Sequence, residues 1–173
     1  AGSRHKNSFF TYRKIPGDIS SLGGNDIQYI FKDSSQRMWV LTTTGGLNLA
    51  LGKDFKMLKF LNYSRKNGLP SQFLLSCVED AKGNLWISTQ NGLSKFSIAK
   101  KKFENFNYNE GLENLNFSEG SSTKMKNGKI VFGTTKGLLS FNPANLQITK
   151  VSSRLAFTNL EINREGGVPG QNS

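Results

Sequence analysis

A repeat of about 45 residues constrains the fold of this chain more than any other feature of its sequence. The segment Gly83–Phe96 reads GNLWISTQNGLSKF, and related phrases precede it, QRMWVLTTTGGLNL, and follow it, GKIVFGTTKGLLSF. Trp39 and Trp86 are 47 residues apart, and Thr89 and Thr134 are 45 residues apart. A period of about 40–50 residues with several short strands per unit is typical of a β-propeller blade.

Four short strands can be predicted within the middle repeat. Its first stretch, FLLSCVED, is mostly apolar, as expected of an inner strand that is buried on both faces. AKGN follows as a tight turn, in which Gly83 can adopt a positive φ. LWIST is rich in β-forming residues, QNG is a hairpin turn, LSKFSI alternates apolar and polar side chains, and FENFNY supplies an outer strand. The third repeat has a weaker outer strand, LQITKV.

We therefore predict an all-β fold of about three four-stranded antiparallel blades, which together form a partial propeller. The predicted segments are residues 1–24 as a tail with the outer strand of a preceding blade, 25–70, 71–115 and 116–150 as the three blades, and 151–173 as the start of a further domain or a loose tail. A closed propeller needs about four to eight blades. A homodimer that closes a six-bladed ring is therefore one hypothesis, and a monomeric mass in light scattering would contradict it.

The net charge of +11 is high for a chain of 173 residues. Proteins this basic often bind nucleic acid or acidic surfaces. The Lys and Arg residues are scattered, however, mostly one per strand or turn, and the one dense run, Lys100–Lys102, is expected to be a solvated turn. We therefore expect this segment to have no nucleic acid partner.

The sequence predicts no cofactor, no metal site and no catalytic residues. Cys77 is the one cysteine and lies in an apolar stretch, so we expect a buried thiol. His5 is the one histidine and lies near the terminus, which disfavours a zinc site or a Ser-His-Asp triad. Glu79 and Asp80 are adjacent, and neighbouring side chains of a strand point to opposite faces. These two carboxylates alone are therefore not expected to form the acid/base pair of a glycosidase.

Residues that recur in the repeats are interpreted as structural. The tryptophans could stack on sugars, but their identical places in successive repeats favour packing between blades. The threonines are expected to bond neighbouring strands, the aspartates to cap turns and the glycines to form turns. The structural repeat positions are Asp33, Trp39, Thr42, Asp80, Gly83, Trp86, Thr89, Gly92, Thr134 and Gly137.

The segments that do not repeat are better candidates for a binding site, because function on repeat frameworks is usually carried by loops. SRKNGLPSQF and NEGLENLNFSEG are expected on one face of the ring, where polar side chains could bond sugar hydroxyls and phenylalanines could stack on sugar rings. The alternative is that they are ordinary solvated loops. The candidate ligand-binding residues are Arg65, Gln72, Phe73, Glu113, Asn114, Asn116 and Phe117.

The middle repeat, DAKGNLWISTQNGLSKF, resembles the regulator-propeller repeat of hybrid two-component systems, which is best known from Bacteroidetes. The first repeat keeps the Asp, Trp and Gly-Leu positions, whereas the third has Met125 in place of Asp and Val131 in place of Trp. NGKIVFGTTKGLLSFNP resembles the closing repeat of such propellers. The following SRLAFTNLEINREGGVPG resembles the first strand of the immunoglobulin-like domain that comes after the propeller.

The resemblance implies a non-enzymatic fragment of a periplasmic sensor region. It implies a carbohydrate ligand, and a signal that passes through a membrane helix to a histidine kinase outside this chain. The remaining blades and the immunoglobulin-like domain of the parent protein would be its partners. Two other interpretations stay open, namely a fragment of a propeller enzyme such as a lyase or glycosidase, and a propeller that binds protein.

Overall fold

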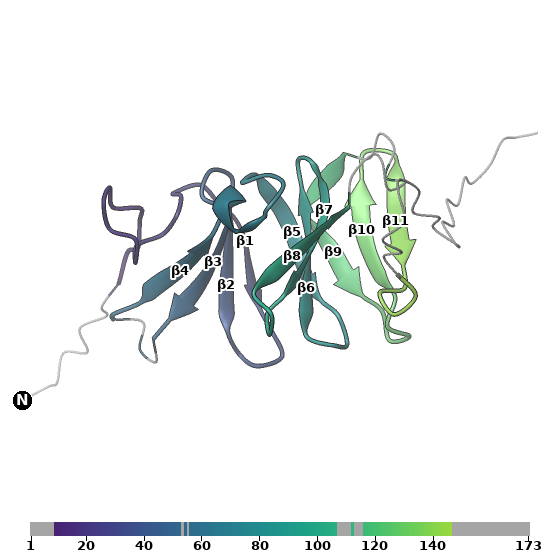
Figure 1. Ribbon diagram of the computed structural model, residues 1–173, viewed down its shortest axis with the longest axis horizontal. Coiled ribbons are helices and arrows are strands. Elements are labelled where there is room, and N and C mark those ends of the chain that lie inside the picture. The colour runs from purple at the N-terminus through teal and green to yellow at the C-terminus, as the bar shows by residue number, and fades with distance from the viewer. Residues whose placement is uncertain (1–8, 53, 55, 107–111, 113–115, 147–173) are drawn as a thin grey trace, which may run out of the picture.

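The chain forms three antiparallel β-sheets that stand side by side in chain order (Figure 1). The computed structural model describes residues 9–52, 54, 56–106, 112 and 116–146. Within these residues no helix is long and apolar enough to cross a membrane. The strands of the three sheets span residues 27–63, 74–106 and 117–141.

Each sheet is a meander in which consecutive strands are neighbours. The first sheet contains β1 (Ile27–Lys32), β2 (Met38–Thr42), β3 (Leu47–Leu51) and β4 (Lys59–Tyr63). The second contains β5 (Leu74–Glu79), β6 (Asn84–Thr89), β7 (Gly92–Ser97) and β8 (Lys102–Phe106). The third contains β9 (Phe117–Lys124), β10 (Ile130–Thr134) and β11 (Gly137–Phe141). The predicted all-β propeller-blade fold is confirmed, and the outer strand expected from LQITKV falls almost wholly outside the described residues.

Apolar side chains fill the two spaces between the three sheets. Trp39 and Leu41 of the first sheet pack against Leu74, Leu85 and Phe96 of the second. The second sheet in turn packs its opposite face on the third, where Ile130, Phe132 and Phe141 are buried. Because both faces of β5 are covered, all six of its residues are buried, which explains why its sequence is apolar rather than alternating.

The same repeat position is exposed where no neighbouring sheet covers it. Cys77 of β5 is 1% exposed between the first and second sheets. Ile30, which is 47 residues earlier and occupies the equivalent place in β1, is 60% exposed. Ile27 is likewise exposed, although the equivalent Leu74 is buried. β1 therefore carries the apolar residues that the repeat places in an inner strand, although Ile27 and Ile30 of β1 are exposed.

Polar contacts also join the sheets. The Glu79 carboxylate at the end of β5 accepts hydrogen bonds from the backbone nitrogen and the hydroxyl of Ser34, both at 2.8 Å, so it fixes the β1–β2 turn of the first sheet. Between the second and third sheets, the Ser122 hydroxyl donates to the Cys77 carbonyl at 3.0 Å. Glu79 is 7% exposed and is thus bonded inside the interface between two sheets.

Residues 9–24 differ from the prediction of an outer strand. The described part of the tail contains turns and no strand, and Gly17 has a positive φ of 81°. It lies beside the edge strand β4, where the Phe60 nitrogen donates to the Ser20 carbonyl at 2.7 Å, but it adds no strand to the sheet. It packs instead on the first sheet, where Leu22 is buried with Val40 and Phe60.

The incoming chain crosses the β2–β3 hairpin closely, and this hairpin is longer than its β6–β7 counterpart. Gly23 and Gly24 pass so near Gly45 that a Cβ on Gly45 would overlap their backbone atoms. Asn48 is fully buried beneath this crossing, with its side-chain oxygen accepting from the Gly23 nitrogen at 2.8 Å and its amide donating to the Val40 carbonyl at 3.0 Å. Only glycine permits two backbones to approach this closely.

Gly45→Ala is therefore expected to destabilise the chain by about 2 kcal/mol or more, because the clash is with backbone rather than with a flexible side chain. Urea denaturation followed by circular dichroism would measure the change. Lys136→Ala lies in the equivalent hairpin of the third sheet and is exposed, so it is the matched control and should change stability by less than about 0.5 kcal/mol. Equal stability of Gly45→Ala and the wild type would contradict the close crossing.

Candidate functional site

The described residues that lead into the first strand of each sheet lie at one end of the sheets, which we call the crossover end. It consists of residues 21–26 before β1, residues 64–73 before β5 and Asn116 before β9, and of the β2–β3, β6–β7 and β10–β11 hairpins. One backbone hydrogen bond recurs there in every sheet and ties the hairpin to the incoming segment. The donor is a backbone nitrogen of the hairpin and the acceptor is the carbonyl of the residue just before the first strand. The pairs are Thr43 to Asp26 at 3.1 Å, Gln90 to Phe73 at 3.1 Å and Thr135 to Asn116 at 2.9 Å.

Two asparagines of the outer strands hold the incoming segments in place. The Asn62 amide of β4 donates to the Ser21 carbonyl at 3.0 Å, and the Asn105 amide of β8 donates to the Gly68 carbonyl at 2.8 Å. Asn62 and Asn105 occupy equivalent places in the first and second sheets. Asn62 precedes Tyr63, which pairs with Leu47 of β3, and Asn105 precedes Phe106, which pairs with Leu93 of β7. The sequence prediction missed this pair, although the shared Asn-aromatic dipeptide at the end of each outer strand was a visible signal.

The structure places most of the candidate ligand-binding residues at the crossover end. Arg65 lies exposed in the short turn η1 (Arg65–Asn67), which Figure 1 shows at the upper edge of the first sheet. Gln72 and Phe73 are half-buried in the same loop, and the Phe73 side chain packs against the core between the second and third sheets. Asn116 is exposed. Glu113 and Asn114 lie outside the described residues.

Phe117 does not suit the stacking role considered for it. It is the first residue of β9 and is 6% exposed. Its ring packs edge-on against Phe132 at a centroid distance of 5.7 Å. The side chain is part of the core between the second and third sheets, so a sugar ring could not reach it without unfolding the strand.

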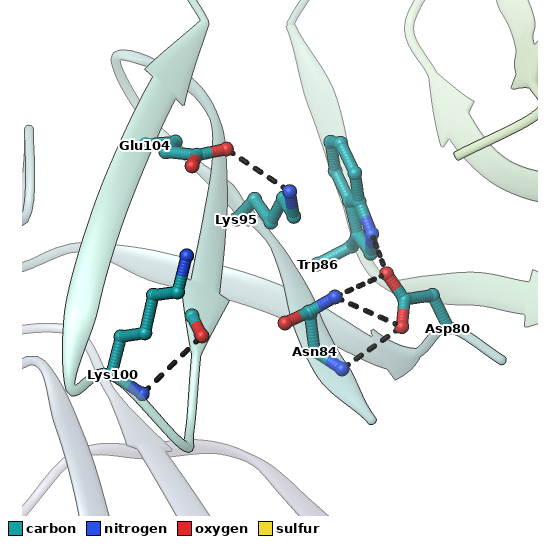
Figure 2. A network of polar contacts seen from close by, with 7 residues as sticks. Asp80, Asn84, Trp86, Lys95, Lys100 and Glu104 are labelled. Atoms are coloured by element: carbon teal, nitrogen blue, oxygen red, sulfur yellow. Dashed lines mark hydrogen bonds and ion pairs between the residues drawn. The ribbon is translucent and has the colours of Figure 1, made fainter. Parts of the chain in front are cut away.

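Each recurring aspartate bonds the indole of the recurring tryptophan. The Asp80 carboxylate accepts from the Trp86 indole nitrogen at 3.0 Å, and also from the Asn84 backbone nitrogen at 2.9 Å (Figure 2). In the first sheet, Asp33 accepts from the Trp39 indole nitrogen at 2.8 Å. Sequence reasoning considered a turn-capping role for these aspartates, and the structure adds that the same carboxylate also satisfies the buried indole.

These carboxylates are held in the ionised form. Burial alone would raise the pKa of Asp80, but hydrogen bonds from Asn84 and Trp86 outweigh it and lower the pKa below its ordinary value. For Asp33 burial also raises the pKa, and bonds from Trp39 and Arg37 again lower it overall. Both side chains are buried and their oxygens are committed to these donors, so neither is placed to protonate a leaving group.

The recurring threonines close the central hairpins. The hydroxyls of Thr42, Thr89 and Thr134 donate to the carbonyls of Gly46, Gly92 and Gly137 at 3.1, 3.0 and 3.0 Å. The same hydroxyl oxygens accept from a backbone nitrogen of the turn, for example from Asn91 at 3.1 Å. This geometry uses the hydroxyl within its own hairpin.

The third sheet keeps the turn but loses the buried carboxylate and indole. Met125 replaces the aspartate and is 50% exposed, and Val131 replaces the tryptophan. The Met125 nitrogen still donates to the Lys129 carbonyl at 2.9 Å, as the Asp80 nitrogen does to the Asn84 carbonyl. The backbone turn is therefore independent of the Asp–Trp pair.

Two further features lie away from the predicted loop residues. Burial raises the pKa of the Cys77 thiol well above its usual value, which makes this side chain a poor nucleophile.

A cavity of about 400 Å³ lies between the tail and β4, lined among others by Tyr12, Met57 and Phe60. No group of three or more metal-ligating side chains occurs among the described residues.

Comparisons with known proteins identify the repeat. The two-component regulator propeller family matches residues 68–91. The extracellular domain of a hybrid two-component system of B. thetaiotaomicron is 32% identical, with a TM-score of 0.62 over 70% of this chain and 16% of that chain. A histidine kinase of Formosa agariphila is 28% identical over 148 residues, which is 86% of this chain and 10% of that protein. The chain thus spans only a small part of either relative.

The fold and the matched segment define a set of propeller blades. The resemblance inferred from the sequence is confirmed, since residues 68–91 match the two-component regulator propeller family.

Proposed function

We propose that this chain is part of the extracytoplasmic sensor region of a hybrid two-component signalling protein. The observation that carries this proposal is the 32% identity and the shared fold over 70% of the chain with the extracellular domain of such a system. In the proposal the ligand is a carbohydrate, and the signal passes to a histidine kinase outside this chain.

The crossover end supports a carbohydrate ligand through its side chains. Arg65 and Asn116 are exposed, and Gln72 is half-buried beside Phe73. Guanidinium and amide groups both donate hydrogen bonds to hydroxyl oxygens, and the amide oxygens accept them in return. The loop that carries Arg65 and Gln72 is anchored by the Asn105–Gly68 bond, so its polar groups are held in place before a ligand arrives.

The alternative of a propeller glycosidase or lyase receives less support. The described acidic side chains nearest one another in sequence, Glu79 and Asp80, are both buried. Glu79 is bonded to Ser34 of the first sheet, and Asp80 is bonded to Asn84 and Trp86. A glycosidase needs two carboxyl groups that face a substrate across a gap of about 5–10 Å.

Calorimetric titration of the complete extracytoplasmic region with a panel of neutral and acidic oligosaccharides tests the proposal. We expect at least one to bind, and we expect Arg65→Ala with Gln72→Ala to raise its Kd about tenfold or more, because each lost hydrogen bond in the bound state is worth about 1 kcal/mol. Asn127→Ala, in the β9–β10 turn at the opposite end, is the control and should leave Kd unchanged. If no saccharide binds the complete region, the proposed carbohydrate ligand is wrong.

A further inference from the structure

The end of the sheets opposite the crossover end gathers lysines that are scattered in the sequence. Antiparallel meanders return every second turn to the same end, so the β1–β2, β3–β4, β5–β6, β7–β8 and β9–β10 turns all lie there. Figure 1 shows these turns along one edge of the three sheets. Each turn or its flanking strand residue carries at least one exposed lysine. We call this surface the basic turn end and define it by Lys32, Lys56, Lys82, Lys100, Lys126 and Lys129.

The acidic side chains at this end point inward. Asp33, Glu79 and Asp80 are buried, and each accepts hydrogen bonds from neighbouring groups of the protein. Asp54 is the one exposed acidic residue in the described turns of this end, and its carboxylate accepts from the Lys56 backbone nitrogen at 3.1 Å. The charge that faces solvent here is therefore mainly positive.

The six lysines have no ion-pair partner among the described residues. Lys95, on the surface of the second sheet, differs because its ammonium bonds Glu104 at 3.0 Å. The Lys100 backbone nitrogen donates to the Ser97 hydroxyl at 3.4 Å, and its ammonium has no ion-pair partner among the described residues (Figure 2). Its ammonium is left to solvent. An exposed ammonium without an ion-pair partner can bind an anion without first breaking an ion pair within the protein.

The crossover end has fewer exposed cationic side chains. It carries exposed Arg65, Lys66 and Lys136 together with exposed Asp26. The basic turn end therefore presents the larger number of exposed ammonium groups to solvent. A surface of one sign attracts a polyanion over a distance of about 10 Å at moderate salt.

We propose that the basic turn end is a contact surface for a linear anionic polysaccharide with carboxylate or sulfate groups. The lysines lie on successive turns of three neighbouring sheets, which suits a chain with regularly spaced charges rather than a single small anion. Lysine presents a point charge without the fixed fork of arginine, so it tolerates varied positions of the anionic groups. The choice of a polysaccharide among polyanions rests on the proposed function.

An anionic membrane is the competing occupant of such a surface. Peripheral membrane binding usually combines basic residues with large apolar side chains that enter the lipid. The two central turns, 80–83 and 98–101, contain no large exposed apolar residue. The exposed Met57 and Met125 lie in the β3–β4 and β9–β10 turns of the same end, at either side of these two turns. The centre of the basic turn end therefore offers charge without an inserting side chain.

The test uses the full chain and two polymers, polygalacturonate and dextran sulfate, with a neutral β-glucan of similar length for comparison. We expect both anionic polymers to bind, and we expect the affinity to fall at least about tenfold between 50 and 200 mM salt. The variant K82Q/K100Q/K126Q removes one charge from each of three turns and should weaken binding about tenfold or more. The control K14Q/K66Q/K136Q removes the same charge near the crossover end and should change it less than twofold.

Three outcomes would overturn the inference. Equal weakening by both variants would mean that net charge alone attracts the polymers. Binding of the neutral glucan as tightly as the anionic polymers, with no effect of the turn variant, would reject the basic turn end and leave the proposed carbohydrate ligand intact. Tight binding to phosphatidylglycerol vesicles that the polymers do not displace would assign the surface to a membrane. All six substituted lysines are exposed, and melting temperatures would verify that each variant is folded.

Discussion

Trp86→Ala is expected to lower the free energy of unfolding by about 4 kcal/mol, which is near the upper end for single core substitutions. Trp86 is 1% exposed and lies between the second and third sheets. Its ring packs on Phe106 at 5.4 Å and on Phe141 at 4.8 Å. The substitution would remove these contacts and leave the Asp80 carboxylate without its indole donor.

Urea denaturation followed by tryptophan fluorescence and circular dichroism would measure this loss. Val131→Ala is the matched control, because Val131 occupies the same repeat position in the third sheet and is only half-buried. We expect it to cost less than about 1.5 kcal/mol, since a smaller side chain is removed from a partly solvated place. If both variants lowered the free energy of unfolding by a similar amount, the repeat position, rather than burial between two sheets, would determine how much the side chain stabilises the fold.

Asp80→Ala is expected to lower the free energy of unfolding by about 3 kcal/mol, because hydrogen bonds to a charged group are strong and the buried donors would stay unpaired. The donors concerned include the Trp86 indole and both nitrogens of Asn84. Lys82→Ala is the control, since its side chain is exposed in the same turn and should matter by less than about 0.5 kcal/mol.

The stability of the wild type should depend on pH in a direction set by the same carboxylate. The pKa of Asp80 is lowered in the folded state, so its contribution is present above the unfolded pKa of about 3.9 and is lost as the pH falls through the folded pKa. Asp80→Asn should flatten this acid limb, which can be measured by unfolding series between pH 2 and 6. An unchanged acid limb would mean that Asp80 contributes nothing to it.

The fold was predictable because the repeat imposes the same local choices three times. The Gly-punctuated turns, the apolar inner strands and the alternating third strands each indicate a blade, and they agree in register. Residues 9–24 were predicted less well. Their composition suits a strand, yet they lie beside β4, with a backbone hydrogen bond from Phe60 to Ser20, and contain turns rather than a strand. Whether a segment forms a ladder with its neighbour depends on how the two lie in the folded chain, which the segment's own sequence does not specify.

The candidate site was predictable in location and only partly in detail. Loops between repeats were chosen as candidates, and Arg65, Gln72 and Asn116 do lie at the crossover end. Phe117 was chosen for its aromatic ring, yet it is 6% exposed. Sequence alone could not separate the last residue of a loop from the first residue of a buried strand, because that boundary depends on the register with β10.

The sequence by itself determined the repeat, the strand order within each sheet and the residues that recur. Tertiary structure decided which copies of a recurring residue are buried, since Cys77 has a sheet on each side and Ile30 does not. It also decided the distribution of charge. Lysines that appear once per turn along the chain meet at one end of the sheets, because an antiparallel meander brings every second turn back to the same end.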